Sequence, residues 1–154
     1  MKIIGEKSLA SVVKILLDLI FLSGMGVLLS LPISVRWYLA YVHGNRNERI
    51  YYFLLILLAV TGILALGIVR EIRKIFNTLN GKDPFIVENV KSLKYMGIFS
   101  FTIAFCYVTK ILFLNSFFTI IIFMIFVIAG FFSIILAEVF RQAVEVKMEN
   151  DYTI

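Results

Sequence analysis

The sequence predicts an all-α fold, an integral membrane four-helix bundle with both termini in the cytoplasm. Hydrophobic residues make up 61% of the 154 residues and charged residues 16%, whereas soluble domains contain about 45–50% and about 25%. The apolar residues gather into four runs, and nearly all charged residues lie between these runs. Each run is long enough to cross a bilayer, where a helix satisfies the backbone groups of an isolated segment.

The four runs predict spans at about residues 12–31, 50–69, 95–114 and 117–137 of a single membrane domain, 1–154. The second and fourth runs contain no charged residue, and the third carries only Lys110. This lysine is close enough to the end of its span for the ammonium to reach the interface. The turn at 115–116 is so short that the third and fourth spans should form an antiparallel hairpin.

The first run is less pure, because it contains Lys14 and Asp18, and Pro32 marks its end or a kink. A basic start followed by an apolar stretch would also suit a signal peptide. The run has no convincing small-residue cleavage site, and Asp18 interrupts the apolar region early. The sequence therefore favours a retained first span.

Lysine and arginine are divided unequally between the two sides of the membrane. Eleven of the 15 lie on the side of the two termini and segment 70–94, Lys14 near the start of the first run included, and four lie on the other side, at Arg36, Arg46, Arg49 and Lys110. Cytoplasmic loops carry the excess of basic residues. This bias predicts a protein of the bacterial cytoplasmic membrane with both termini inside. It also accounts for the net charge of +5 without nucleic acid as a direct partner.

Segment 70–94 is predicted to be a cytoplasmic loop made of two short helices. Apolar residues continue at helical spacing beyond the second span, so this helix should extend out of the membrane. Asn80-Gly81 supplies a natural helix stop. Asp83 and Pro84 then suit the N-cap and the first position of a second helix, which runs into the third span.

The C-terminal tail, 138–154, is predicted to leave the fourth span as a helix. Arg141 and Glu145 are four residues apart, which favours an ion pair on one helix face. The last residues, 151–154, do not follow a helical pattern, which favours an extended tail that is either frayed or docked.

The loop and the tail carry two motifs that resemble a known family. The loop contains Gly81-Lys82-Asp83-Pro84-Phe85, Glu88-Asn89-Val90-Lys91-Ser92-Leu93 and Gly97, and the tail contains Glu138-Val139-Phe140-Arg141 and Asp151-Tyr152-Thr153-Ile154. The loop motif resembles the Pro-Phe and Glu-Asn pattern of domain-of-unknown-function family 2975, and the tail motif resembles its Glu-x-Phe-Arg and Asp-x-Thr ending. This is an uncharacterised bacterial family of four-span membrane proteins. Ile86 departs from this pattern by replacing a small polar residue, so Asp83 is expected to cap the helix instead.

The resemblance implies no catalytic residues, because the family has none established. Its members are often encoded beside a small helix-turn-helix DNA-binding protein, so the resemblance implies a regulatory partnership with a soluble DNA-binding regulator. It covers nearly the whole chain once the order of the spans is included.

The sequence offers no catalytic, cofactor or metal constellation, so an enzyme is the least expected class. Cys106 and His43 are the only cysteine and histidine, and one of each does not make a metal site. His43 is interpreted as a loop residue and Cys106 as a packed or lipid-facing one. The small-xxx-small pairs Gly26/Ser30, Thr61/Ala65 and Ala129/Ser133 indicate close helix packing.

Asp18 is the one ionisable residue with two open interpretations. A carboxylate inside a span should be paired or should face the bundle interior. The structural interpretation is an ion pair with Lys14, one helical turn away, joined by Glu138 or Arg141 from a neighbouring span. In the functional interpretation, Lys14 and Asp18 form an intramembrane polar site for a proton or a ligand.

Three functional hypotheses follow from this distribution of charge. The first is a non-enzymatic membrane regulator that binds a soluble partner through its cytoplasmic face. The candidate partner surface comprises Arg70, Arg73, Lys74, Asp83, Pro84, Phe85, Asn89, Phe140, Arg141, Asp151 and Thr153. The basic residues at 70, 73 and 74 would equally suit anionic lipid headgroups. The alternatives are a transporter or channel subunit, which would need to form a homo-oligomer, and a protein of envelope-stress or peptide tolerance.

Overall fold

The computed structural model of the chain describes residues 9–41, 48–79, 84–114 and 116–152. These residues form four long helices, α1 (Leu9–Tyr41), α2 (Glu48–Leu79), α3 (Val87–Phe113) and α4 (Phe117–Tyr152). Each of the four is long and apolar enough to cross a membrane. The predicted all-α fold with four candidate spans is therefore confirmed.

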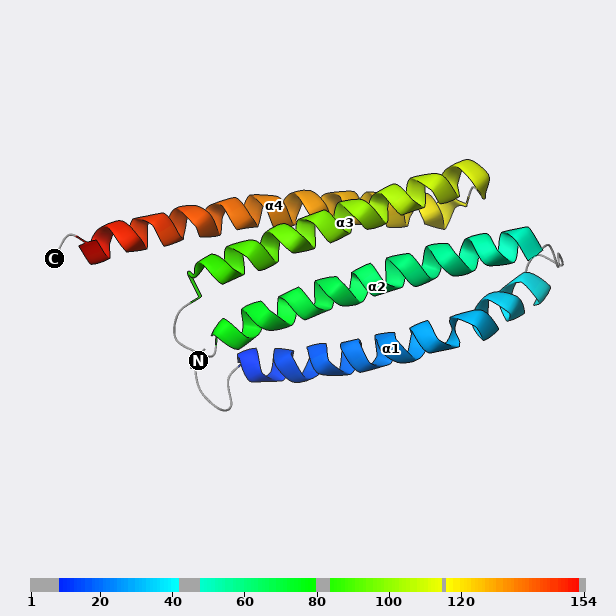
Figure 1. Cartoon of the computed structure of the whole chain (residues 1–154), viewed down its shortest axis with the longest axis horizontal. Helices are drawn as coiled ribbons and strands as arrows, with labels where there is room; N and C mark the ends of the chain where they lie inside the picture. The colour runs from blue at the N-terminus through cyan, green and yellow to red at the C-terminus, as the bar shows by residue number, and fades with distance from the viewer. Residues whose placement is uncertain (1–8, 42–47, 80–83, 115, 153–154) are drawn as a thin grey trace.

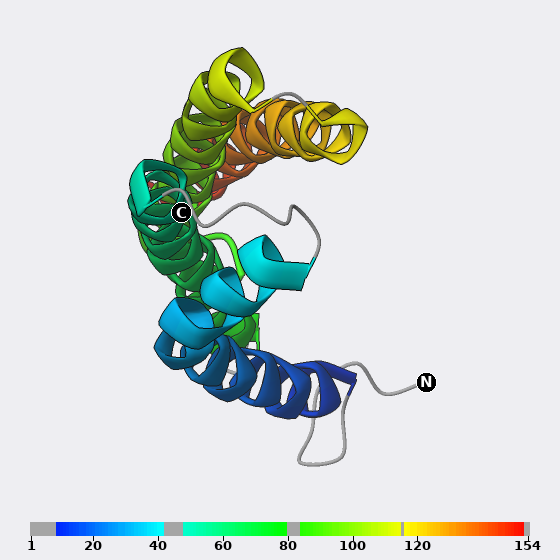
Figure 2. The ribbon, with the colours of Figure 1, turned by 90° about the vertical axis from the view of Figure 1, so that its right-hand side faces the viewer.

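The four helices run antiparallel to their chain neighbours and form an open bundle (Figure 1). Close backbone contacts join α1 to α2, α2 to α3 and α3 to α4, and none joins α1 to α4 within the described residues. Seen end-on, the row of helices curves into an arc, with α1 and α4 at its two ends (Figure 2). The bundle therefore has a concave inner face between its first and last helices.

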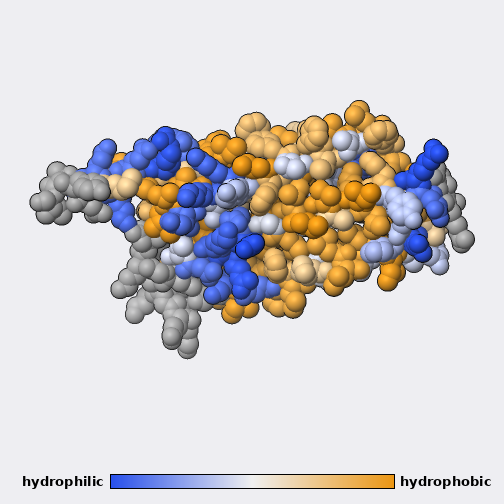
Figure 3. Space-filling model, viewed as in Figure 1, coloured by the Kyte–Doolittle hydropathy of each residue, from blue (hydrophilic) through white to orange (hydrophobic). Residues whose placement is uncertain are grey.

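The outer surface is a wide apolar band between two polar ends (Figure 3). Large hydrophobic side chains are exposed along this band, such as Leu29 (80% exposed), Leu112 (77%) and Ile33 (75%). So much exposed apolar surface would be unfavourable in water and favourable in hydrocarbon. The band is therefore the lipid-facing surface of a multi-pass membrane protein.

Glycine allows close approach at some helix contacts. A Cβ atom at Gly97 of α3 would lie 2.7 Å from Ile134 Cγ1 of α4, and one at Gly24 of α1 would lie 2.6 Å from Leu66 Cδ2 of α2. Small residues are typical of such contacts in membranes. A Cβ atom at Gly26, by contrast, would meet no atom within 4 Å, so the packing role predicted from the spacing of Gly26 to Ser30 is wrong.

Helix α1 continues past the predicted end of the first span. Pro32 lies inside the helix, which ends at Tyr41, so this proline does not terminate it. A proline removes one backbone donor, and membrane helices tolerate this loss where a neighbouring helix packs alongside. Here α2 packs along α1.

The connection between α2 and α3 differs in part from the prediction. Helix α2 extends without a break to Leu79, which confirms the predicted extension. Helix α3 begins at Val87, with Ile86 as its N-cap in an extended conformation (φ −127°, ψ 153°) and no side-chain cap. Pro84 therefore does not open the helix, and the predicted cap at Asp83 is wrong. Gly81 and Asp83 themselves lie outside the described residues.

Helix α4 continues through Tyr152, so the helical tail is confirmed, and an extended chain at residues 151 and 152 was the wrong expectation. Extending an existing helix by one residue requires no new nucleation, which explains why residues with a weak helical pattern still continue the helix. Residues 153 and 154 lie outside the described residues.

Candidate functional site at the charged end

Most charged residues of the described chain lie at one end of the bundle, which we call the charged end. The start of α1, the end of α2, the start of α3 and the end of α4 meet there (Figures 1 and 3). Its described basic residues are Lys14, Arg70, Arg73, Lys74, Lys91, Lys94, Arg141 and Lys147. The opposite end, which we call the loop end, has Arg36, Arg49 and Lys110.

Asp18 of α1 pairs with Arg73 of α2. Arg73 Nε lies 2.8 Å from Asp18 Oδ1, and both side chains are a little over 40% exposed. The predicted partner, Lys14, has no ion pair within the described residues, and Glu138 and Arg141 pair with each other instead. The predicted pair of Lys14 with Asp18 is therefore wrong, and the pair that Asp18 does form joins two helices rather than two turns of one helix.

Glu71 is a buried carboxylate that the sequence reasoning missed. It is 6% exposed, and Lys74 Nζ donates a hydrogen bond of 2.6 Å to its Oε1. The three-residue spacing of an acid and a base on a helix could have indicated this pair. Arg73 and Lys74, two of the predicted partner-surface residues, are thus already engaged in ion pairs.

Asn89 ties the end of α2 to the start of α3. Its side chain is 1% exposed, and its Nδ2 donates hydrogen bonds of 2.7 Å to Thr78 Oγ1 and to the Pro84 carbonyl oxygen. These bonds hold Pro84 in a non-helical position and fix where α3 begins. Asn89 therefore lies in the interior of the charged end, and its predicted place on the exposed partner surface is wrong.

The loop motif and the tail motif meet in space through two aromatic rings. The ring centres of Phe85 and Phe140 lie 5.3 Å apart, which is a favourable aromatic distance. Phe85 precedes α3, and Phe140 lies in the part of α4 that follows the apolar run. The two segments that carry the family resemblance thus form one continuous part of the charged end.

Arg141 links two carboxylates on the exposed face of α4. Its Nη2 lies 2.5 Å from Glu138 Oε1, and its Nη1 lies 2.7 Å from Glu145 Oε1. The predicted pair of Arg141 and Glu145 is confirmed. The hydrogen bond from Arg141 lowers the pKa of the exposed Glu138 to about 2, and the same contact raises the pKa of Arg141.

The remaining predicted site residues are dispersed or lie outside the described residues. Arg70 is exposed on α2, and the backbone of Asp151 lies in the last turn of α4. Thr153 and His43 belong to the part of the chain that is not described. Among the residues that the structure does describe, no group of three His, Cys, Asp or Glu side chains lies together as metal ligands would.

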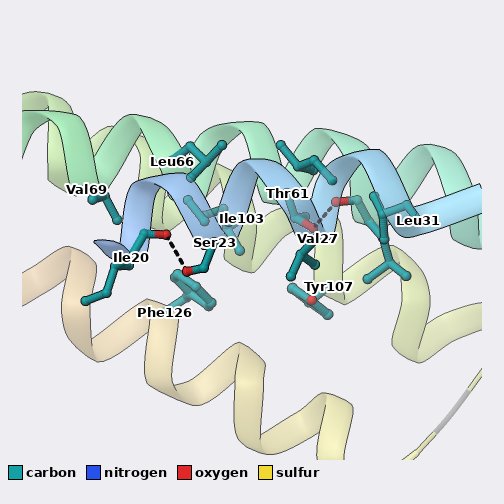
Figure 4. A pocket seen from close by; sticks show the side chains of 15 residues that line it. Ile20, Ser23, Val27, Leu31, Thr61, Leu66, Val69, Ile103, Tyr107 and Phe126 are labelled. Atoms are coloured by element: carbon teal, nitrogen blue, oxygen red, sulfur yellow. Dashed lines mark hydrogen bonds between the residues drawn. The ribbon is translucent and has the colours of Figure 1, made fainter. Parts of the chain in front are cut away.

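Two adjoining cavities on the concave face form a second candidate site, which the sequence reasoning did not find. The first, of about 430 Å³, is lined by residues of all four helices (Figure 4). Ile20, Ser23 and Val27 of α1 face it from one side, and Tyr107 and Phe126 from the other. The second, of about 560 Å³, lies toward the loop end. No periodic pattern in the sequence distinguishes a groove from lipid-facing surface, because both are apolar.

The fold and the charged end together define a multi-pass membrane protein built from four helices. The chain belongs to a family described as proteins of unknown function (DUF2975), whose family model matches residues 29–154. This match confirms the resemblance carried by the loop and tail motifs. No curated protein and no solved structure matches the chain.

Proposed function

We propose that the protein is a non-enzymatic regulator in the bacterial cytoplasmic membrane, with both termini in the cytoplasm, and that its charged end binds a small soluble DNA-binding protein. The orientation rests on the unequal distribution of lysine and arginine, since the basic side of a membrane protein stays in the cytoplasm. The kind of partner rests on the resemblance to the family.

The projection of α4 is the observation that best supports a docking role. This helix has 36 residues and is therefore about 54 Å long, against a hydrocarbon core of about 30 Å. The part beyond the apolar run carries exposed hydrophobic side chains, Val146 (57% exposed) and Met148 (45%), among charged ones. Apolar side chains on a helix outside the membrane favour a protein partner.

The ion pairs of α2 weigh against a purely lipid-binding role for this basic face. Arg73 is paired with Asp18 and Lys74 with Glu71, which reduces the net charge available to anionic headgroups. Of the three basic residues considered for lipid binding, only Arg70 has no ion pair within the described chain. One unpaired cation supplies about 1 kcal/mol at a membrane surface.

Two truncations of the full-length protein test the docking surface. Ending the chain after Glu145 removes the projecting turns and leaves Phe140 and the Arg141 ion pairs in place, whereas ending it after Ala137 removes the whole tail. We expect a small helix-turn-helix DNA-binding protein of the same bacterium to co-purify with the intact protein and with neither truncated form. Equal co-purification with all three, at equal membrane abundance, would contradict docking on the tail.

A separate measurement tests the orientation. A reporter that is active only in the cytoplasm, fused after Ile154, should be active, and a reporter that requires export should be silent. The opposite pattern would place the charged end outside and would overturn the proposed function.

A further inference from the structure

The two cavities of the concave face form one groove along the membrane-spanning part of the protein. Leu31 and Leu58 line both cavities, so the cavities adjoin. On α1 the lining extends from Ile20 to Leu39, which corresponds to about 28 Å of helix. The groove therefore runs through most of the thickness of a hydrocarbon core.

The groove is polar at the loop end and apolar over the rest of its length. Five polar side chains line the loop-end cavity, namely Ser34, Tyr38, Lys110, Ser116 and Thr119. The other cavity is lined by aliphatic and aromatic side chains and two glycines, apart from Ser23 and Thr61, whose hydroxyls donate hydrogen bonds to carbonyl oxygens of their own helices. This division matches an amphiphile whose polar head lies at the loop end and whose chain lies deeper in the membrane.

The charge at the polar end selects the kind of head group. Lys110 is half-buried, and its Nζ lies 5.9 Å from the centre of the Tyr107 ring. No carboxylate among the described residues pairs with it. Thr119, in the first turn of α4, is 1% exposed, and its Oγ1 has no hydrogen-bond partner within the described chain. An unpaired cation, a hydroxyl donor and a helix N-terminus together favour an anion.

The groove is reached from the lipid phase. It lies between α1 and α4, whose backbones do not come into contact, and exposed apolar residues such as Val27 (60% exposed) and Phe118 (74%) flank it. A bilayer lipid can therefore enter sideways without leaving hydrocarbon. Cavities of this size are typical of sites for small ligands.

We propose that the groove binds an anionic phospholipid of the surrounding bilayer, with its phosphate beside Lys110 and Thr119 and one acyl chain between α1 and α4. This site is separate from the charged end and does not depend on the proposed regulatory partner or on the orientation of the protein.

Quenching of a single tryptophan by brominated lipids tests this site in the full-length protein. In a Trp37→Phe background, Phe118→Trp places a reporter on the groove, and Leu112→Trp places a matched reporter on the outer surface near the same end of the bundle. Each protein is reconstituted with dibromophosphatidylglycerol or dibromophosphatidylcholine of equal chain length. The ratio of the two binding constants then gives the headgroup preference at each reporter.

We expect the groove reporter to prefer the anionic lipid by about five-fold and the outer reporter to show no preference. Lys110→Gln should abolish the preference, and Arg36→Gln, which removes a cation from the same end outside the groove, should leave it unchanged. Equal preferences at both reporters would overturn the proposal. A preference that survives Lys110→Gln, or that falls equally with Arg36→Gln, would also overturn it.

Discussion

Arg73 of α2 pairs with Asp18 of α1, with Nε 2.8 Å from Oδ1. The pair joins α1 to α2, and it gives the partly exposed carboxylate of Asp18 a partner from another helix. Exposed ion pairs contribute about 0.2–1 kcal/mol, and removal of one partner at the edge of a membrane leaves the other charge without compensation.

We expect Asp18→Asn and Arg73→Gln each to lower the thermal stability of the protein in detergent, and the double variant to be no less stable than the worse single one. A double-mutant cycle measures this coupling. Lys14→Gln is the matched control and should change stability little, because Lys14 has no ion pair in the described chain. If the effects of the two substitutions on stability are additive, the ion pair contributes nothing to stability. If the Asp18→Asn protein is equally abundant in the membrane and its function is unchanged, the functional interpretation of Asp18 is excluded.

The contact of Phe85 with Phe140 should hold the loop motif against the tail. Aromatic pairs contribute about 0.5–1.5 kcal/mol beyond the area that they bury, so Phe85→Ala and Phe140→Ala should each destabilise the protein. Their effects on stability should not be additive, because either substitution removes the same contact. Phe132→Ala, at a lipid-facing position 64% exposed, is the control. In both Phe variants, backbone amides at the start of α3 should exchange hydrogen faster than in the unsubstituted protein. Unchanged exchange there would count against the contact.

The two glycines with opposite surroundings should respond in opposite ways to alanine. Gly97→Ala introduces a Cβ 2.7 Å from Ile134 Cγ1 and 3.4 Å from the Gly130 carbonyl oxygen, so α3 and α4 must shift and stability should fall. Gly26→Ala meets no atom within 4 Å, so it should be neutral or should stabilise α1 by up to about 1 kcal/mol, the helix propensity difference. Thermal unfolding in one detergent compares the two, and equal losses would contradict the described packing.

The pKa of Glu138 should depend on Arg141. It is lowered from 4.5 to about 2 in the folded protein, so any stabilisation by this carboxylate is present above about pH 4.5 and is lost as the pH falls toward 2. Arg141→Gln should return the pKa toward 4.5 in a carboxyl-carbon NMR titration. Arg70→Gln, which removes a cation from another helix, should leave it low. A pKa that stays near 2 without Arg141 would show that another group sets it.

Local chemistry was sufficient to predict several parts of the charged end. The extension of α2 to Leu79 and the pair of Arg141 with Glu145 follow from helical spacing, which involves neighbours on a single helix. The start of α3 could not be predicted in this way. Asp83-Pro84 is a favourable local start for a helix. The helix nevertheless begins later, because the Asn89 side chain donates hydrogen bonds to Thr78 and to the Pro84 carbonyl oxygen.

The amino-acid sequence by itself determined that the chain forms four helices in a lipid environment, because helix formation and the transfer of apolar residues into hydrocarbon depend on each segment alone. Only the tertiary structure decided that Asp18 pairs with Arg73, that Phe85 meets Phe140 and that the bundle is open between α1 and α4. In a soluble helix the apolar face shows which side is buried. In a membrane helix both the packed and the lipid-facing sides are apolar, so the faces that meet are chosen by shape and by a few polar contacts.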